Sequence, residues 1–264
     1  MLLRSFPARV KIYFTAKPGI SSRSEILMND STIAPLLTLA VLLGVTHTVM
    51  GPDHYIPFLA MARAGSWNFV KTLWVTILCG IGHVGSSVVI GLGGVALGMA
   101  VGKLEALEYF RGDIAGWLLL GFGLAYTVYG IRVAVRNIPH THPHAHLDGE
   151  KHTHEHGHYG GHVHIHDEQS AKKSPLSIWP LFVIFVFGPC EPLIPQLMYP
   201  AAKGNWNAVI AVAIIFSAAT ILTMSAIVAT GYYGLKKIPS MERYTHLAAG
   251  TAILLCGVAV KMGF

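Results

Sequence analysis

The feature that most constrains this chain is the length of its uncharged stretches. No Asp, Glu, Lys or Arg occurs in residues 72–102, 114–131 or 204–235, and residues 174–202 contain only Glu191. Charged residues make up 12% of the chain, against about 25% in an ordinary soluble domain. Because a helix that crosses a bilayer needs about 20 mostly apolar residues, this distribution indicates a membrane protein.

Six stretches are long enough to cross a membrane, and they predict an all-α, polytopic membrane protein. They cover residues 33–62, 69–101, 114–136, 176–201, 206–234 and 245–263. The first and the fourth contain a Gly-Pro step, which interrupts a helix and frees backbone groups that neighbours or a cavity must satisfy. We therefore expect six transmembrane helices, of which the first and the fourth are broken.

The two interrupted stretches resemble each other, which predicts an inverted repeat. The Gly-Pro step at 51–52 aligns with that at 188–189, and Trp67-Asn68 aligns with Trp206-Asn207, when two one-residue insertions are allowed. Each copy would contain three helices, and this odd number would reverse the second copy in the membrane. Paired Gly/Pro-interrupted segments at equivalent places are typical of the central site of a transporter.

Four segments follow from this division of the chain. They are an N-terminal extension (1–32), a first three-helix repeat (33–136), a His-rich loop (137–175) and a second three-helix repeat (176–264). The extension is basic, and we interpret it either as preceding a true start at Met28 or as a targeting segment.

The distribution of Lys and Arg predicts the orientation in the membrane. The loops at 63–71, 132–175 and 235–244 contain ten of them, and the opposite side contains four when the first 27 residues are left out. Lys and Arg are enriched in cytoplasmic loops. We therefore expect an inner-membrane, multi-pass protein with a cytoplasmic His-rich loop and both termini outside. The positive charge lies at the ends of spans, which argues against a nucleic-acid partner.

Ionisable side chains inside the predicted spans point to a functional site. His47, Asp53, His54, His83 and Glu191 are the members of this set. A charge at the centre of a spanning helix costs at least about 2.5–3.5 kcal/mol, so such residues usually face the protein interior and have a function. Imidazole and carboxylate groups suit Ni²⁺, Co²⁺, Zn²⁺ or Fe²⁺.

We expect His47, Asp53 and His54, completed by His83 from the next span, to ligate a divalent transition metal. Three further residues are candidate additional ligands: Cys190, Glu191 and Ser86. In the repeat alignment, Cys190 lies opposite Asp53 and Glu191 lies opposite His54. Both copies therefore place two candidate ligands directly after the Gly-Pro step.

Eleven of the fifteen histidines lie in one loop, mostly two residues apart. They are His140, His142, His144, His146, His152, His154, His156, His158, His162, His164 and His166. A period of two does not line one face of an α-helix, and the glycines and proline of the loop predict a flexible segment. His-rich tracts are typical of exchangeable metal binding, so we expect this loop to capture or buffer metal ions.

The motif H-x-x-x-G-x-D-H at 47–54 resembles the first-span signature of the HupE/UreJ nickel permeases, with Thr48 where that family has Pro. It is also similar to the His-x4-Asp-His signature of the NicO/NiCoT nickel–cobalt transporters, with one extra residue before Asp53. His83 and the His-rich loop are likewise similar to that group. The resemblance implies a six-span permease for Ni²⁺ or Co²⁺, with His47, Asp53 and His54 as ligands.

The sequence thus predicts a transporter of Ni²⁺ or Co²⁺, with Zn²⁺ as a further candidate and efflux favoured over uptake. No prosthetic group and no enzymatic activity are expected. Expected partners are the bilayer, divalent metal ions, and a second copy of the chain or a metallochaperone. Two alternatives use the same residues: an intramembrane metal-dependent hydrolase with Asp53 or Glu191 as general base, and a thiol redox carrier that uses Cys190.

Overall fold

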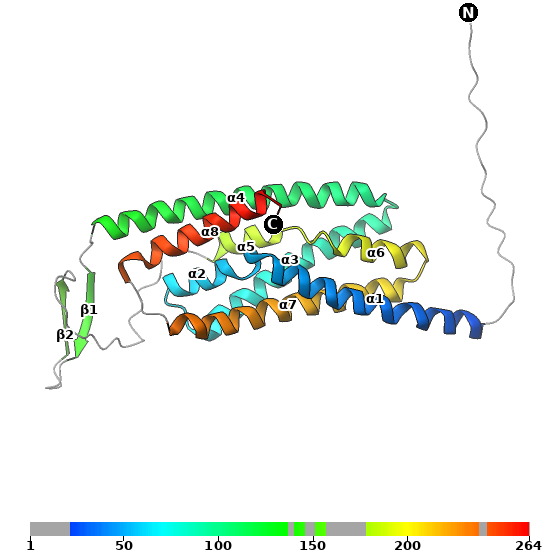
Figure 1. Ribbon diagram of the computed structural model, residues 1–264, viewed down its shortest axis with the longest axis horizontal. Helices are drawn as coiled ribbons and strands as arrows, with labels where there is room; N and C mark the ends of the chain where they lie inside the picture. The colour runs from blue at the N-terminus through cyan, green and yellow to red at the C-terminus, as the bar shows by residue number, and fades with distance from the viewer. Residues whose placement is uncertain (1–21, 137–139, 146–150, 157–177, 238–241, 264) are drawn as a thin grey trace, which may run out of the picture.

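The computed structural model describes residues 22–136, 140–145, 151–156, 178–237 and 242–263, mostly as long helices packed side by side (Figure 1). The helices are α1 (Ser22–Met50), α2 (Ile56–Ala64), α3 (Phe69–Ala96), α4 (Val101–Arg136), α5 (Trp179–Phe187), α6 (Leu193–Ala202), α7 (Trp206–Lys236) and α8 (Thr245–Lys261). Two 3-10 turns, η1 (Pro52–His54) and η3 (Glu242–Tyr244), precede α2 and α8. Apart from one two-stranded hairpin, the regular structure of the described residues is helical.

Four of the described segments are long and apolar enough to cross a membrane. They are Ile33–Met50 of α1, the whole of α3, Val101–Val135 of α4 and the whole of α7. Large apolar side chains are exposed on the outer surface of these helices: Val89 is 71% exposed, Leu222 68% and Phe110 61%. Lipid tails cover such surfaces at little cost, so these helices indicate a multi-pass membrane protein.

Both expected helix interruptions occur at their Gly-Pro steps. Helix α1 ends at Met50, where the Gly51 N–H still donates to the His47 carbonyl at 3.1 Å, and the chain then turns through η1 into α2. Helix α5 ends at Phe187, directly before Gly188-Pro189, and α6 begins at Leu193. A proline has no N–H to continue the ladder of hydrogen bonds, so each break leaves a short irregular segment.

The N-caps of α3 and α7 change the expected alignment of the two halves. Asn68 caps α3 by accepting from the Lys71 N–H at 2.8 Å, and Asn205 caps α7 by accepting from the Ala208 N–H at 3.0 Å. Each cap follows its own Gly-Pro step after the same number of residues. Asn205 therefore has the capping role of Asn68, whereas Asn207, which the expected alignment places opposite Asn68, lies inside α7.

Helices α4 and α8 lie against each other along most of α8 (Figure 1). Glycines on both helices allow this approach, since a Cβ atom on Gly123 would lie 2.4 Å from the Leu254 nitrogen and one on Gly250 would lie 2.4 Å from the Thr127 nitrogen. Small residues are the usual means of bringing membrane helices into backbone contact. This contact closes the bundle on the side opposite the pair of α1 and α7, which also lie side by side (Figure 1).

Two helix starts lie earlier than expected. Helix α4 begins at Val101 rather than at residue 114, so residues assigned to a loop belong to a helix. Helix α1 begins at Ser22, inside the segment 1–32 that was expected to be an extension. Residues 1–21 of that segment lie outside the described residues.

Part of the His-rich loop forms a β-hairpin instead of the expected flexible segment. Strand β1 (His140–Ala145) pairs antiparallel with β2 (Lys151–His156), in a register that places His140 opposite His156, His142 opposite His154 and His144 opposite His152. The period of two that excludes a helical face is the period of a β-strand. The remaining loop histidines, His146, His158, His162, His164 and His166, lie outside the described residues.

Candidate metal centre

Both helix breaks and the middle of α3 contribute to one cluster of buried side chains. His47 belongs to the last turn of α1, His54 ends η1, and His83 lies midway along α3. Cys190 follows directly after Gly188-Pro189, between α5 and α6. His54, His83 and Cys190 are all buried. Residues that are far apart in the sequence are thus brought together inside the bundle.

The three imidazole rings lie in mutual contact. The ring centroids of His47 and His54 are 4.7 Å apart, those of His54 and His83 are 4.9 Å apart, and those of His47 and His83 are 6.1 Å apart. The ligand atoms of His47, His83 and Cys190 all lie within 4.8 Å of one another. Nitrogen and thiol donors at this separation can converge on a single metal ion.

Hydrogen bonds at Nδ1 of His54 direct the other nitrogen of its ring toward His83. Its Nδ1 faces two acceptors, the Gly51 carbonyl at 3.1 Å and the Asp53 carboxylate at 3.2 Å. These contacts assign the proton to Nδ1, as is common for metal-ligating histidines. The lone pair of Nε2 then points at His83 Nε2, 3.3 Å away.

The Nε2 atom of His47 is buried and has no hydrogen-bond partner. A buried polar group without a partner is destabilising, and such a group in a native structure calls for an explanation such as a bound ion. This atom belongs to the ring that faces both His54 and His83. The orphaned nitrogen therefore fits a site that a cation completes.

Three of the expected ligands lie outside the group formed by His47, His83 and Cys190. The Asp53 carboxylate contacts His54 Nδ1 at 3.2 Å, a position from which it orients that ring. The Glu191 side chain is exposed, because the turn after Pro189 directs only Cys190 inward. The Ser86 hydroxyl donates to the His83 carbonyl at 2.8 Å and thus supports α3. Of the additional candidates, Cys190 is the one whose ligand atom joins those of His47 and His83.

A buried ion pair between Glu108 and Arg111 of α4 was missed from the sequence. Starting the third span at residue 114 left both residues in a predicted loop, where charges need no partner. The sequence did contain a signal for this pair. Glu108 and Arg111 are an acid and a base three residues apart, and that spacing places them on one face of a helix. Both side chains contact the irregular segment around Gly188 and Cys190.

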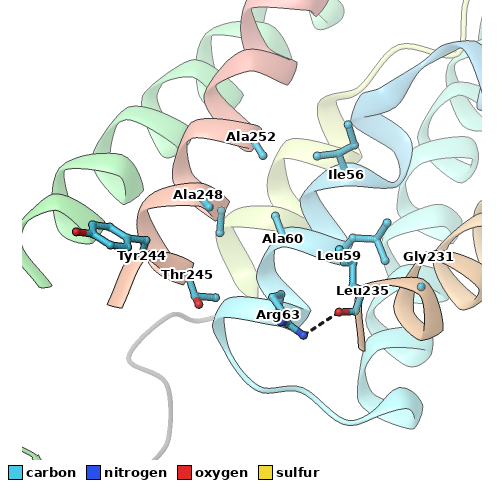
Figure 2. Close-up of a pocket in the computed structure, with 12 residues that line it drawn as sticks. Ile56, Leu59, Ala60, Arg63, Gly231, Leu235, Tyr244, Thr245, Ala248 and Ala252 are labelled. Carbon is cyan, nitrogen blue, oxygen red and sulfur yellow. Dashed lines mark hydrogen bonds between the residues drawn. The ribbon is translucent and has the colours of Figure 1, made fainter. Parts of the chain in front are cut away.

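A separate cavity of about 610 Å³ opens between α2, α7 and α8 (Figure 2). Its lining is mostly apolar, with Leu59, Ala60 and Ala252 among the residues drawn in Figure 2. Arg63 lies at this cavity and donates to the Leu235 carbonyl at 2.9 Å. A cation would find no anionic ligand here, so the His/Cys cluster is the better candidate for metal binding among the described residues.

Two imidazoles and a thiol, with the His54 ring beside them, form a donor set that suits a divalent transition metal. Cys in particular favours softer ions such as Zn²⁺ over Mg²⁺ or Ca²⁺. The thiol would have to lose its proton to bind. No protein-family model, no curated protein and no solved structure matches the chain. The functional conclusion therefore rests on the site itself.

Proposed function

We propose that the protein transports divalent transition-metal ions across a membrane, with His47, His54, His83 and Cys190 binding the ion midway. Ni²⁺ and Co²⁺ are the expected cargo, with Zn²⁺ as a further candidate, and the family proposed is that of the nickel–cobalt permeases. The observation that carries the proposal is the buried, unpartnered His47 Nε2 beside two other imidazoles and a buried thiol.

The position of the cluster supports transport over permanent metal storage. Two of its members, His54 and Cys190, belong to the irregular segments between broken helices. Non-helical backbone at membrane depth is tolerated where it is buried or lines a cavity, and it frequently marks the binding site of a transporter. A site held by two short segments can open when either half of the bundle moves.

We propose six spans arranged as two inverted repeats, with α1-η1-α2 equivalent to α5-α6, α3 to α7, and α4 to α8. The N-caps Asn68 and Asn205, each at the same distance from its Gly-Pro step, support this equivalence. The packing of α3 on α7 and of α4 on α8 also supports it. In a two-fold arrangement, equivalent helices would meet around the pseudo-two-fold axis. The two halves would rock around the ion in alternating access.

We propose that the protein lies in the inner membrane, with its His-rich loop in the cytoplasm. The loop would supply ions to the central site. Its histidines would bind metal reversibly, because an imidazole must be neutral to ligate and its usual pKa is about 6.5. A cytoplasmic capture segment favours export of excess ion over uptake. The proposed orientation, with both termini outside, follows from the Lys and Arg asymmetry.

The decisive experiment measures Co²⁺ and Ni²⁺ flux into proteoliposomes that contain the full chain. His47→Ala and His83→Ala should abolish flux, whereas His246→Ala should retain it. His246 is the matched control, since it contacts Tyr126 at 2.8 Å and has no place in the cluster. Flux that is unchanged in His47→Ala, or absent from the wild type with every metal tested, contradicts the proposal.

The two alternative functions make different predictions in the same preparation. A metal-dependent hydrolase would cleave substrate in detergent and would show no flux. A thiol redox carrier needs a second cysteine to resolve Cys190, and the residue equivalent to Cys190 in the repeat is Asp53. A thiol redox carrier leaves the unpartnered His47 nitrogen unexplained, whereas a bound cation satisfies it in the transporter and in the hydrolase alike. The flux measurement therefore separates those two.

A further inference from the structure

Helix α4 contains a buried ion pair that the proposed transport site does not use directly. Glu108 is fully buried, Arg111 is 7% exposed, and their side chains contact each other one helical turn apart. Burying two charges is expensive unless additional hydrogen bonds satisfy them. The partners of this pair therefore indicate what it does.

Glu108 and Arg111 satisfy the backbone groups that the second helix break leaves free. One Glu108 carboxylate oxygen accepts from the Cys190 N–H at 3.0 Å. The Arg111 guanidinium donates to the carbonyls of Val186 at 2.8 Å and Gly188 at 3.3 Å. The pair thus holds the chain on both sides of Pro189, from the last turn of α5 to the residue that carries the thiol.

The same pair is connected to α3 at the level of His83. Arg111 donates to the Ser86 hydroxyl at 2.6 Å, and Ser86 in turn donates to the His83 carbonyl at 2.8 Å. Ser87 donates to Glu108 at 2.9 Å. Two residues of the cluster, His83 on α3 and Cys190 between α5 and α6, are therefore tied to one ion pair.

The first break has no such support among the described residues, and its own backbone explains why. The His54 N–H donates to the Gly51 carbonyl at 3.0 Å, and the Tyr55 N–H donates to the Pro52 carbonyl at 3.3 Å. The η1 turn thus satisfies much of its own backbone. At the second break the turn comes later, where the Leu193 N–H donates to the Cys190 carbonyl at 3.0 Å. The Gly188 carbonyl and the Cys190 N–H are instead bonded to side chains of α4.

We infer that Glu108 and Arg111 are positioning residues that hold the Cys190 thiol in the metal cluster and so supply the proposed site with its sulfur ligand. Neither side chain ligates the ion. This inference rests on the proposed function, because a thiolate ligand matters only if the cluster binds metal. Without the pair, His83 would keep the position that α3 gives it, and Cys190 would leave the site.

The first test uses the full-length protein loaded with Co²⁺, whose thiolate-to-metal charge-transfer absorption reports on sulfur ligation and does not respond to histidines. The double variant Glu108→Leu/Arg111→Met removes both charges and leaves none unpaired. We expect it to bind Co²⁺ and to lose this absorption to the level of Cys190→Ser. Glu108→Gln, which keeps an acceptor for the Cys190 N–H, should retain at least half. Asp113→Asn is the matched control, since Asp113 of the same helix forms an ion pair with Lys261, away from the segment that carries Cys190.

The second test needs no metal and separates the two proposals. In a Cys79→Ala/Cys256→Ala background, Cys190 is the remaining cysteine, and a membrane-permeant alkylating reagent should modify it at least tenfold faster in the double variant than in its parent. A folded double variant that keeps both the absorption and slow alkylation overturns the inference. If the wild type shows no Co²⁺ absorption while the alkylation rates differ as expected, the metal proposal fails and the positioning role stands.

Discussion

Replacing Asp53 with Asn tests whether Asp53 is itself a metal ligand or only orients the ligand His54. In the structure the Asp53 carboxylate accepts from His54 Nδ1, so the metal-facing nitrogen of His54 is the opposite one. Asparagine keeps the size of the side chain and one acceptor oxygen, and it removes the charge. The proposed site should therefore retain all its ligands and lose only part of the support for one of them.

The magnitude follows from the two acceptors at His54 Nδ1. The Gly51 carbonyl, 3.1 Å away, remains when Asp53 is changed, so the ring keeps one partner that selects the same tautomer. Loss of an orienting group typically weakens metal affinity by about 10- to 100-fold. With half of the support retained, we expect the low end, about tenfold or roughly 1.4 kcal/mol. His54→Ala removes the ligand and should cost far more.

Initial rates of Co²⁺ entry into proteoliposomes, measured over a range of metal concentrations, provide the assay. Asp53→Asn should raise the KM about tenfold with flux still measurable at saturation. His54→Ala should leave no saturable flux under the same conditions. If Asp53→Asn and His54→Ala are equally inactive, Asp53 is itself a ligand, and the assignment of an orienting role is refuted.

Three further predictions test the bundle, the thiol and the loop. Gly123→Ala should lower the free energy of unfolding by about 1–3 kcal/mol through overpacking against α8, whereas Gly121→Ala, which has open space around it, should be neutral or stabilising; equal shifts in thermal unfolding would contradict the close contact. Cys190→Ser should reduce Zn²⁺ flux more than Ni²⁺ flux in competition assays, while Cys79→Ser should leave that ratio unchanged, and a uniform loss would refute a sulfur ligand. Deleting residues 140–166 should lower the number of metal ions bound per chain in equilibrium dialysis, and unchanged stoichiometry would exclude a buffering role.

Several elements of the fold followed from local chemistry. The breaks at Gly51-Pro52 and Gly188-Pro189 were predictable because proline cannot donate to the helix ladder wherever it lies. His47 and His54 were identifiable as candidate site residues because polar groups in an apolar stretch need partners. By contrast, the start of α4 was misplaced, because the charges at Glu108 and Arg111 resemble a loop until their partners are known.

The sequence by itself determined that the chain is helical, apolar over membrane-crossing lengths, and interrupted at two Gly-Pro steps. These properties depend on residue type and short-range spacing. Only the tertiary structure decided which polar groups meet. Cys190 and Glu191 are neighbours in the chain, but the turn after Pro189 buries one and exposes the other. The role of Asp53 likewise depends on which nitrogen of His54 it contacts, and that is a property of three-dimensional packing rather than of residue order.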